Sequence, residues 1–291
     1  REDDMAHDFY RPPAWHHFRA GLNEAGRMIA FDHHFITVGM NGETISGSNL
    51  SKNHYPAGLV ENFRLRQSII ETRVPTGPWR APGHSAYCFP YQGFFDEVAI
   101  AAGRDPLEFR LDLLANPTGE LQLDPKRSSD TLRVVAEKAG WGRDMEAGRG
   151  LGIAFHFDHR GHTAHIAEVT VDGSRFSLDK MTVAVDIGPI LNMSGAKSQV
   201  EGCVIDGLST TQLETTIADG AAQQLNFDDY PMPRIDKAPD VECHFIQSDN
   251  SPTGLGEPPF PGVAPAIANA IYAASGKRVR EMPFTRAGMS L

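Results

Sequence analysis

Cysteine is scarce in this sequence, which carries only Cys88, Cys203 and Cys243 among its 291 residues. The three lie far apart and form none of the closely spaced patterns that hold an iron–sulfur cluster. At most one pair can form a disulfide within the chain, and burial as small apolar thiols is the other expectation. No iron–sulfur cluster is therefore expected on this chain.

Long apolar runs and an excess of positive charge are also missing. No run of about 18 apolar residues occurs, so the sequence predicts no membrane-spanning helix. Lys and Arg number 27 against 37 Asp and Glu, which gives a net charge of −10 and a pI near 5.6. Nucleic acid is an unsuitable partner for such a chain, because its phosphates require clustered basic side chains.

The composition that remains is that of a globular protein. Hydrophobic residues make up 41% and charged residues 22%, and the length allows a large core and two domains. Strand and helix patterns are mixed without a regular βαβ alternation. The sequence therefore predicts an α+β fold with two domains, over residues 1–147 and 148–291.

Several elements can be predicted from local patterns. Residues 14–40 indicate a β-hairpin around Asn23-Glu24-Ala25-Gly26, and residues 41–60 indicate a polar loop. Prolines and glycines over residues 75–83 predict a rigid loop. Further strands are expected at 60–71, 150–156, 165–171, 176–186, 214–217 and 241–247, and helices at 89–102, from Asp105-Pro106 onward, and at 131–139, 194–213 and 264–274.

One short segment is chemically unusual. Gly254-Leu255-Gly256-Glu257-Pro258-Pro259 holds a single carboxylate within a run of glycines and prolines. A carboxylate fixed in such a turn suits proton abstraction, because a general base must be held within hydrogen-bond reach of its target. The alternative is that Glu257 caps the helix that follows.

This turn resembles the catalytic turn of the molybdenum hydroxylases, the xanthine dehydrogenase and aldehyde oxidase family. Other segments agree in the same order along nearly the whole chain: Arg1-Glu2-Asp3-Asp4-Met5 up to Arg11-Pro12, residues 76–83, residues 103–110, Val185-Asp186-Ile187-Gly188 with Asn192, and Gln199-Val200-Glu201-Gly202. Within the family, the chain resembles the C-terminal part of the beta subunit of isoquinoline 1-oxidoreductase. The resemblance implies the mixed sheets and helices of the family's molybdopterin-binding domain.

The resemblance also assigns roles to residues. Glu257 would be the base beside the molybdenum, and Arg11 would orient the substrate. The cofactor would be bound by Trp79, Arg80, Ala81 and Gly83 of the rigid loop, by Gln199 and Glu201 near the start of a helix, and by Gly256. Each role has an alternative. The rigid loop could be only a proline-stiffened surface loop, and Arg11 only a surface arginine before Pro12. Gln199 and Glu201 could reflect the ordinary polarity of a helix N-terminus.

The function implied is that of a molybdenum-dependent oxidoreductase, which oxidises an N-heteroaromatic ring or an aldehyde with oxygen from water. The cofactor would be a molybdopterin cytosine dinucleotide, without flavin. The family's Met-Gly-Gln-Gly and Gly-Gly-Phe-Gly segments are absent, and Arg1 has no Met before it, so the chain is expected to be a processed, truncated or separately encoded portion of a longer subunit.

The expected partners are the N-terminal portion that bears these pterin motifs, an iron–sulfur small subunit and a small-molecule substrate. The subgroup implies a periplasmic or membrane-associated location, and a cytoplasmic one stays open. The rival function is that of a non-catalytic truncated homologue acting as a scaffold or binding module.

Histidines are dense at 16–17, at 33–34 and over 156–165. Neighbouring histidines on a strand point to opposite faces and cannot chelate one ion together. Residues 156–165 surround an expected turn, where zinc binding would require convergent side chains. The sequence therefore assigns no metal ligand. A role for this turn in the substrate pocket, and a hydrolase that uses Glu257 with a metal, remain alternatives.

Overall fold

The computed structural model describes residues 2–45, 47 and 49–291. Arg1 of the N-terminal motif, and Ser46 and Ser48 of the predicted loop, lie outside the described residues. The first sheet consists of β1 (Ala14–Leu22), β2 (Met28–Met40), β3 (Glu43–Thr44) and β4 (Asn62–Glu71). β1 and β3 pair with β2 antiparallel, whereas β4 pairs with β2 parallel.

The hairpin between β1 and β2 forms where the sequence predicts it. The Asn23 side chain accepts hydrogen bonds from the backbone N–H groups of Ala25 and Arg27, and Gly26 takes a φ of 70°. An Asx turn closed by a glycine in the left-handed region reverses the chain within five residues.

The second sheet has the order β10-β7-β6-β5. Its strands are β5 (Arg149–Asp158), β6 (Gly161–Asp172), β7 (Arg175–Asp186) and β10 (Asp240–Phe245). β5, β6 and β7 form an antiparallel meander, and β10 joins the edge of β7 in parallel. The remaining strands, β8 (Ile217–Ala218) and β9 (Ala221–Ala222), form a small separate hairpin.

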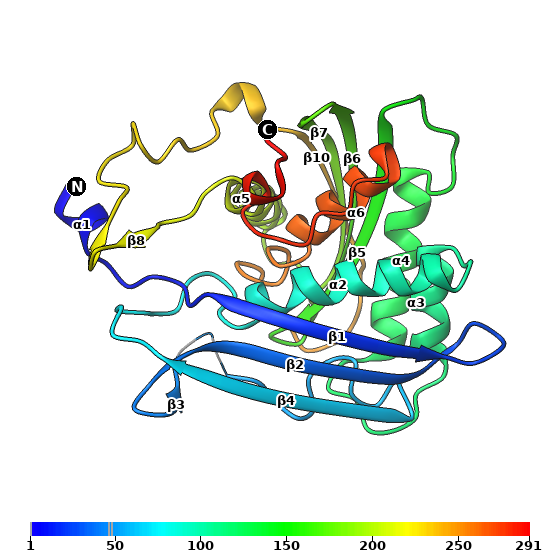
Figure 1. Ribbon diagram of the computed structural model, residues 1–291. Helices are drawn as coiled ribbons and strands as arrows, with labels where there is room; N and C mark the ends of the chain where they lie inside the picture. The colour runs from blue at the N-terminus through cyan, green and yellow to red at the C-terminus, as the bar shows by residue number, and fades with distance from the viewer. Residues whose placement is uncertain (1, 46, 48) are drawn as a thin grey trace.

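Helices separate and cover the two sheets (Figure 1). They are α1 (Glu2–Ala6), α2 (His84–Ala101), α3 (Pro106–Ala115), α4 (Pro125–Ala139), α5 (Met193–Thr210) and α6 (Val263–Ser275), with 3₁₀ turns at Ile235–Lys237 and Phe284–Ala287. α2 packs on the first sheet through an aromatic core that includes Phe31, Phe35 and Phe95. α3 and α4 cover one face of the second sheet, and α5 and α6 cover the other.

Alternation along β5 explains how both faces of the second sheet are used. Leu151, Ile153 and Phe155 pack towards α3 and α4. Gly150 and Gly152 face α6 so closely that a Cβ on Gly152 would lie 2.1 Å from the backbone nitrogen of Ala270. The α6 backbone therefore rests directly on the strand, and only glycine fits there.

The α+β class is confirmed, because helices lie against mixed sheets without a regular βαβ alternation. The division at residue 147 stays a prediction. That position falls in the turn before β5, and α4, from the first half of the chain, packs on the sheet of the second half.

Two helices begin earlier than predicted. α2 starts at His84 instead of residue 89, with Pro90 inside the helix. α4 starts at Pro125 instead of residue 131, because the Asp124 side chain caps it by accepting from the N–H groups of Lys126 and Arg127. This is the Asp-Pro start that the sequence correctly predicts for α3 at Asp105.

In the described part of the chain, no helix combines the length and the apolar character needed to cross a bilayer. All three cysteines are free thiols. Cys88 and Cys203 are buried as expected, but Cys243 is only half-buried.

Candidate functional site

The segment with Glu257 is a rigid connection between β10 and α6. Its neighbours Leu255, Pro258 and Pro259 are buried. Two of its carbonyl groups are held by β6: the Thr163 hydroxyl donates to Pro258 O at 3.1 Å, and the His165 ring bonds Pro259 O through Nε2 at 2.7 Å. The backbone on the C-terminal side of Glu257 is thus tied to the sheet.

Glu257 does not cap α6. That helix begins at Val263, its N-cap is Gly262, and no side chain caps it. The Glu257 side chain is 36% exposed, and its Oε2 lies 3.3 Å from Nδ1 of His159. The carboxylate is therefore accessible to a small molecule and has one ionisable neighbour at contact distance.

Arg80 ties three distant segments together beside this turn. Its Nε donates to Gly256 O at 2.5 Å, Nη1 to Asp206 at 2.9 Å, and Nη2 to Gln199 at 3.3 Å. Gln199 and Asp206 stand on α5, seven residues apart and hence on one face of the helix. The planar guanidinium uses all three nitrogens and fixes the rigid loop, α5 and the Glu257 turn in one geometry.

The rest of the rigid loop packs into the same place. Ala81 forms a buried apolar cluster with Cys203 and Phe260. The Trp79 ring meets Phe260 edge-on at 5.3 Å, and the Arg11 guanidinium lies 4.6 Å from the Trp79 centroid. The loop ends in left-handed backbone, with φ of 53° at Ala81 and 79° at Gly83.

Most of the residues to which the resemblance assigns a role therefore lie close together around Arg80 and Phe260. Arg80 contacts Gly256 and Gln199 directly, whereas Trp79, Ala81 and Arg11 join through Phe260 and ring contacts. Their roles in binding remain predictions.

Glu201 does not join this cluster. It is exposed on α5, and its charge acts on Cys243 of β10. The expectation that Gln199 and Glu201 lie near the start of the helix is wrong, because α5 begins at Met193 and the two residues occupy its second and third turns. Asp206, seven residues after Gln199 on α5, also belongs to this cluster and is not predicted from the sequence.

A chain of ionisable side chains leads inward from Glu257. His159 Nδ1 lies 3.1 Å from Asp158 Oδ1, which lies 3.3 Å from His84 Nε2. His84 Nδ1 in turn lies 3.1 Å from Nε2 of His156. His84 opens α2, 72 residues before its partner on β5, so no local sequence pattern could link the two.

Burial governs the protonation of the inner groups. It lowers the pKa of both the His84 and the His156 imidazoles and favours their neutral forms. Burial raises the pKa of the Asp158 carboxyl, while His84 and His159 act in the opposite direction. Asp158 is 3% exposed, and its Oδ2 has no hydrogen-bond partner among the described residues.

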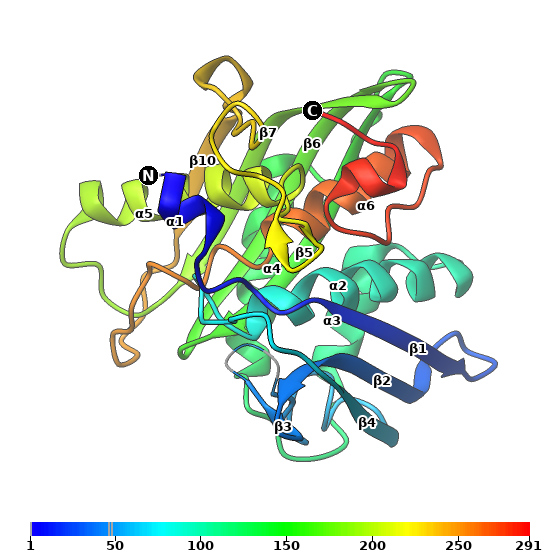
Figure 2. The same ribbon diagram turned by 60° about the vertical axis from the view of Figure 1, so that its left-hand side comes forward.

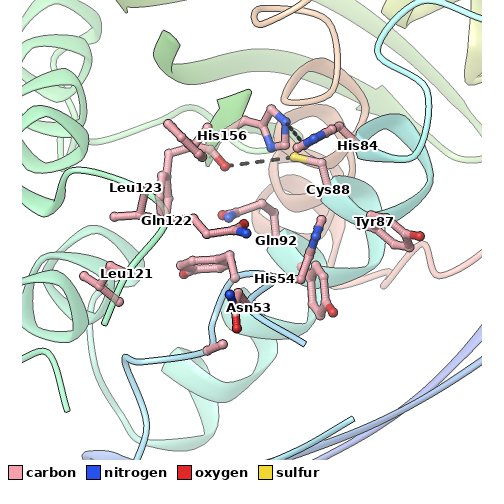
Figure 3. A pocket seen from close by; sticks show the side chains of 15 residues that line it. Asn53, His54, His84, Tyr87, Cys88, Gln92, Leu121, Gln122, Leu123 and His156 are labelled. Carbon is pink, nitrogen blue, oxygen red and sulfur yellow. Dashed lines mark hydrogen bonds between the residues drawn. The ribbon is translucent and has the colours of Figure 1, made fainter. Parts of the chain in front are cut away.

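His84 and His156 line a small cavity between α2, β5 and the loops that contain residues 53–57 and 121–123 (Figure 3). Its volume is about 40 Å³, and His54, Tyr87, Tyr91 and Gln122 also contribute to its wall. Such a space holds water, whereas small-molecule pockets are about tenfold larger. Glu257 is not among its lining residues, so the substrate would have to approach Glu257 from another side.

Comparisons with known proteins agree on the family. The sequence profile of a molybdopterin cofactor-binding domain matches residues 126–239. The chain is 30% identical to a membrane-bound aldehyde dehydrogenase (pyrroloquinoline-quinone) of Gluconacetobacter polyoxogenes, over 97% of this chain and 40% of that protein. It is 31% identical to isoquinoline 1-oxidoreductase subunit beta of Brevundimonas diminuta, over 70% of this chain and 26% of that protein.

Solved structures agree on the fold. Quinoline 2-oxidoreductase from Pseudomonas putida 86 superposes with a TM-score of 0.77 at 11% identity, over 94% of this chain and 61% of that one. Aldehyde oxidoreductase from Desulfovibrio gigas superposes with a TM-score of 0.71 at 15% identity, over 94% and 48%. The chain spans less than half the length of the two curated relatives. It belongs to the molybdenum hydroxylase family and corresponds to part of a molybdopterin-binding subunit.

Proposed function

We propose that this chain is the catalytic portion of a molybdenum hydroxylase that oxidises an N-heteroaromatic ring or an aldehyde with oxygen from water. The observation that carries the proposal is the convergence on Arg80, which joins the rigid loop, α5 and the Gly256 carbonyl directly beside an accessible Glu257. Three segments far apart in sequence are thereby fixed around one carboxylate, as a general base requires.

The residues around this carboxylate suit a molybdopterin group. Tyr10 and Thr76, which flank Arg11 and the rigid loop, bury hydroxyl groups without a partner among the described residues. Gly256 has no side chain, so the Gln199 side chain can come close to it. Gln199 Oε1 lies 3.4 Å from the position that a Cβ on residue 256 would take. Gln199 and the backbone of residues 79–83 would hold the group, and Arg80, which contacts Gln199, would position both. When bound, the cofactor supplies the electron-accepting metal.

In the reaction, this chain would contribute proton transfer and orientation. Glu257 would accept a proton at Oε2 as the oxygen derived from water is activated. His159 Nδ1, which lies 3.3 Å from Oε2, would hold that carboxylate in position. Arg11, whose guanidinium lies over the Trp79 ring, would orient the substrate and stabilise negative charge that develops on it.

The test is Glu257→Gln in the assembled enzyme, with Glu24→Gln as the matched control in the exposed turn of the first hairpin. Gln keeps the shape of Glu but cannot take up a proton at neutral pH. Molybdenum content should stay unchanged, while substrate-driven reduction in a rapid-mixing experiment should slow by at least ~10²-fold. Reduction at the wild-type rate would remove Glu257 from the mechanism.

The proposed cofactor is the cytosine dinucleotide form of molybdopterin, shared with another segment or chain and used without flavin. The proposed partners are the N-terminal portion that bears the pterin motifs and an iron–sulfur small subunit. Exposed apolar side chains support a missing partner: Leu191, Met193, Ile217, Leu225, Phe227, Met232 and Ile235. The segment of residues 217–232 and α1 stand away from the sheets on one side (Figure 1) and face the viewer in Figure 2.

A non-catalytic scaffold is the second candidate, favoured by the absence of the two pterin motifs from the sequence. The name of the Gluconacetobacter relative also mentions a quinone cofactor. Molybdenum, pterin and quinone analysis of the purified complex separates the candidates. Molybdenum and pterin with a co-purifying motif-bearing chain would support the hydroxylase, and their absence would favour the scaffold. Membrane or periplasmic location, proposed from the subgroup, can be checked by fractionation.

A further inference from the structure

We propose that His84, His156 and Asp158 form a binding site for a divalent cation of the zinc class. The site would lie at the wall of the small cavity between α2 and β5. It uses neither Glu257 nor the residues proposed to hold the pterin, so it stands or falls independently of the hydroxylase function. The sequence alone assigns no metal ligand to these three residues.

The spacing of the three side chains fits one ion. One ligand atom from each residue lies within 4.8 Å of the others. His84 contacts both partners through different nitrogens: Nδ1 lies 3.1 Å from His156 Nε2, and Nε2 lies 3.3 Å from Asp158 Oδ1. One ion can take only one nitrogen from each imidazole. Two tetrahedral zinc ligands with bonds of about 2.05 Å would lie about 3.3 Å apart, so ligand atoms that now lie within 4.8 Å of one another would draw together when the ion binds.

Figure 3 shows the two imidazoles at one end of the cavity, with their nitrogens directed towards each other. They come from the first turn of α2 and the end of β5, so rigid elements on opposite sides of the cavity present them. Sites on helices and strands hold ligand geometry better than sites on loops.

Asp158 is the second, independent reason to expect a cation. Its carboxylate is 3% exposed, and Oδ2 has no hydrogen-bond partner among the described residues. Within residues 2–45, 47 and 49–291, its ion-pair contacts are with His84 and His159, and none is with Lys or Arg. A buried carboxylate with an unused oxygen is costly unless a positive charge compensates it.

The donor set selects the kind of ion. Two imidazole nitrogens and one carboxylate oxygen suit Zn²⁺, whereas Mg²⁺ and Ca²⁺ prefer oxygen ligands. Three protein ligands leave a fourth position open, and the cavity beside His84 and His156 has room for a water molecule there. The His84 side chain is 31% exposed, which gives the ion a route from solvent.

A second triad, Asp158, His159 and Glu257, shares the same carboxylate. The His159 side chain is 57% exposed and that of Glu257 is 36% exposed, so water can already solvate the polar atoms of both. The triad of His84, His156 and Asp158 is the less exposed of the two, so it gains more from an ion. The proposal therefore commits to His84, His156 and Asp158.

The experiment is equilibrium dialysis of the assembled enzyme, first stripped with chelator, against ZnCl₂ at pH 7, with bound zinc measured by mass spectrometry. The wild type should bind one zinc per chain beyond any retained by His84→Gln. The His84 side chain is partly exposed, so this variant should fold, and it should bind zinc at least ~10-fold more weakly than the wild type. Asp158→Asn should do the same, and His17→Gln, at an exposed position on β1, should bind as the wild type does.

X-ray absorption at the zinc edge gives a readout that does not depend on the variants. A bound ion should show nitrogen and oxygen ligands at about 2.0–2.1 Å, with the signature of two imidazoles. Wild-type zinc affinity in both His84→Gln and Asp158→Asn would overturn the proposal. So would a wild-type protein that binds no zinc at micromolar concentration.

Discussion

Acidification should destabilise this protein steeply, because several of its histidines are buried in neutral form. His33 and His165 are 0% exposed and His162 is 1% exposed. Burial lowers the pKa of His33 to about 3, and those of His162 and His165 to about 4, from 6.5. Between these values and 6.5, the unfolded chain binds protons that the folded protein does not. The stability is therefore fully present above pH 6.5 and is lost as the pH falls.

The magnitude follows from the shifts. A histidine whose pKa falls from 6.5 to about 4 lowers the free energy of unfolding by about 2 kcal/mol between pH 7 and pH 5. The three together give about 6 kcal/mol, which is comparable with the whole stability of a typical domain. Asp96 and Asp158 act in the opposite direction, because burial raises the pKa of each carboxyl.

The assay is urea unfolding at pH 7 and pH 5, followed by tryptophan fluorescence. His165→Gln can still donate a hydrogen bond towards Pro259 O but cannot titrate, so its loss of stability between the two pH values should be about 2 kcal/mol smaller than that of the wild type. The exposed His17→Gln should lose as much as the wild type. If His165→Gln also shows the full wild-type loss, a neutral buried His165 is refuted.

Three further substitutions test the site and the fold. Arg80→Lys keeps one charge but loses the planar fork, so turnover should fall about tenfold with molybdenum retained; an unchanged turnover would argue against a positioning role. Arg11→Lys should lower turnover to a degree that depends on the substrate, because Lys lacks the planar guanidinium that lies over the Trp79 ring. Wild-type kinetics on every substrate would make Arg11 an ordinary surface residue. Gly152→Ala should cost about 3 kcal/mol or more in thermal or urea unfolding, since its Cβ would meet the α6 backbone, whereas Gly93→Ala, with open space around it, should be tolerated.

Local chemistry determined which elements could be predicted. The hairpin at Asn23 and the helix start at Asp105 depend on side chains that bond their own neighbours, so the sequence is sufficient to locate them. The sequence predicts the start of α2 five residues late, and Pro90 lies inside the helix. Packing against the first sheet outweighs the cost of that proline.

The residues of the candidate site also fall into two groups, those that the sequence indicates and those that only the fold brings together. The turn at Glu257 and the loop at Arg80 were identified by their resemblance to a family, and the structure places them together. Asp206 and His84 were missed, because their importance depends on which helix faces which strand. The contact between His84 and His156 exists only after α2 has packed beside β5. No pattern within either segment carries that information.

The parallel pairing of β10 with β7 has a consequence for the order of folding. Antiparallel β5, β6 and β7 can pair as soon as they are synthesised, but β10 must return across the long segment that contains α5. Pairings between distant parts of a chain form late, because the loop must close before the contact gives any stability. Glu257 lies directly between β10 and α6, so its surroundings would be among the last to become native. A nascent or partly unfolded molecule would then lack the proposed base even when most of its core is formed, which would confine the proposed chemistry to fully folded chains.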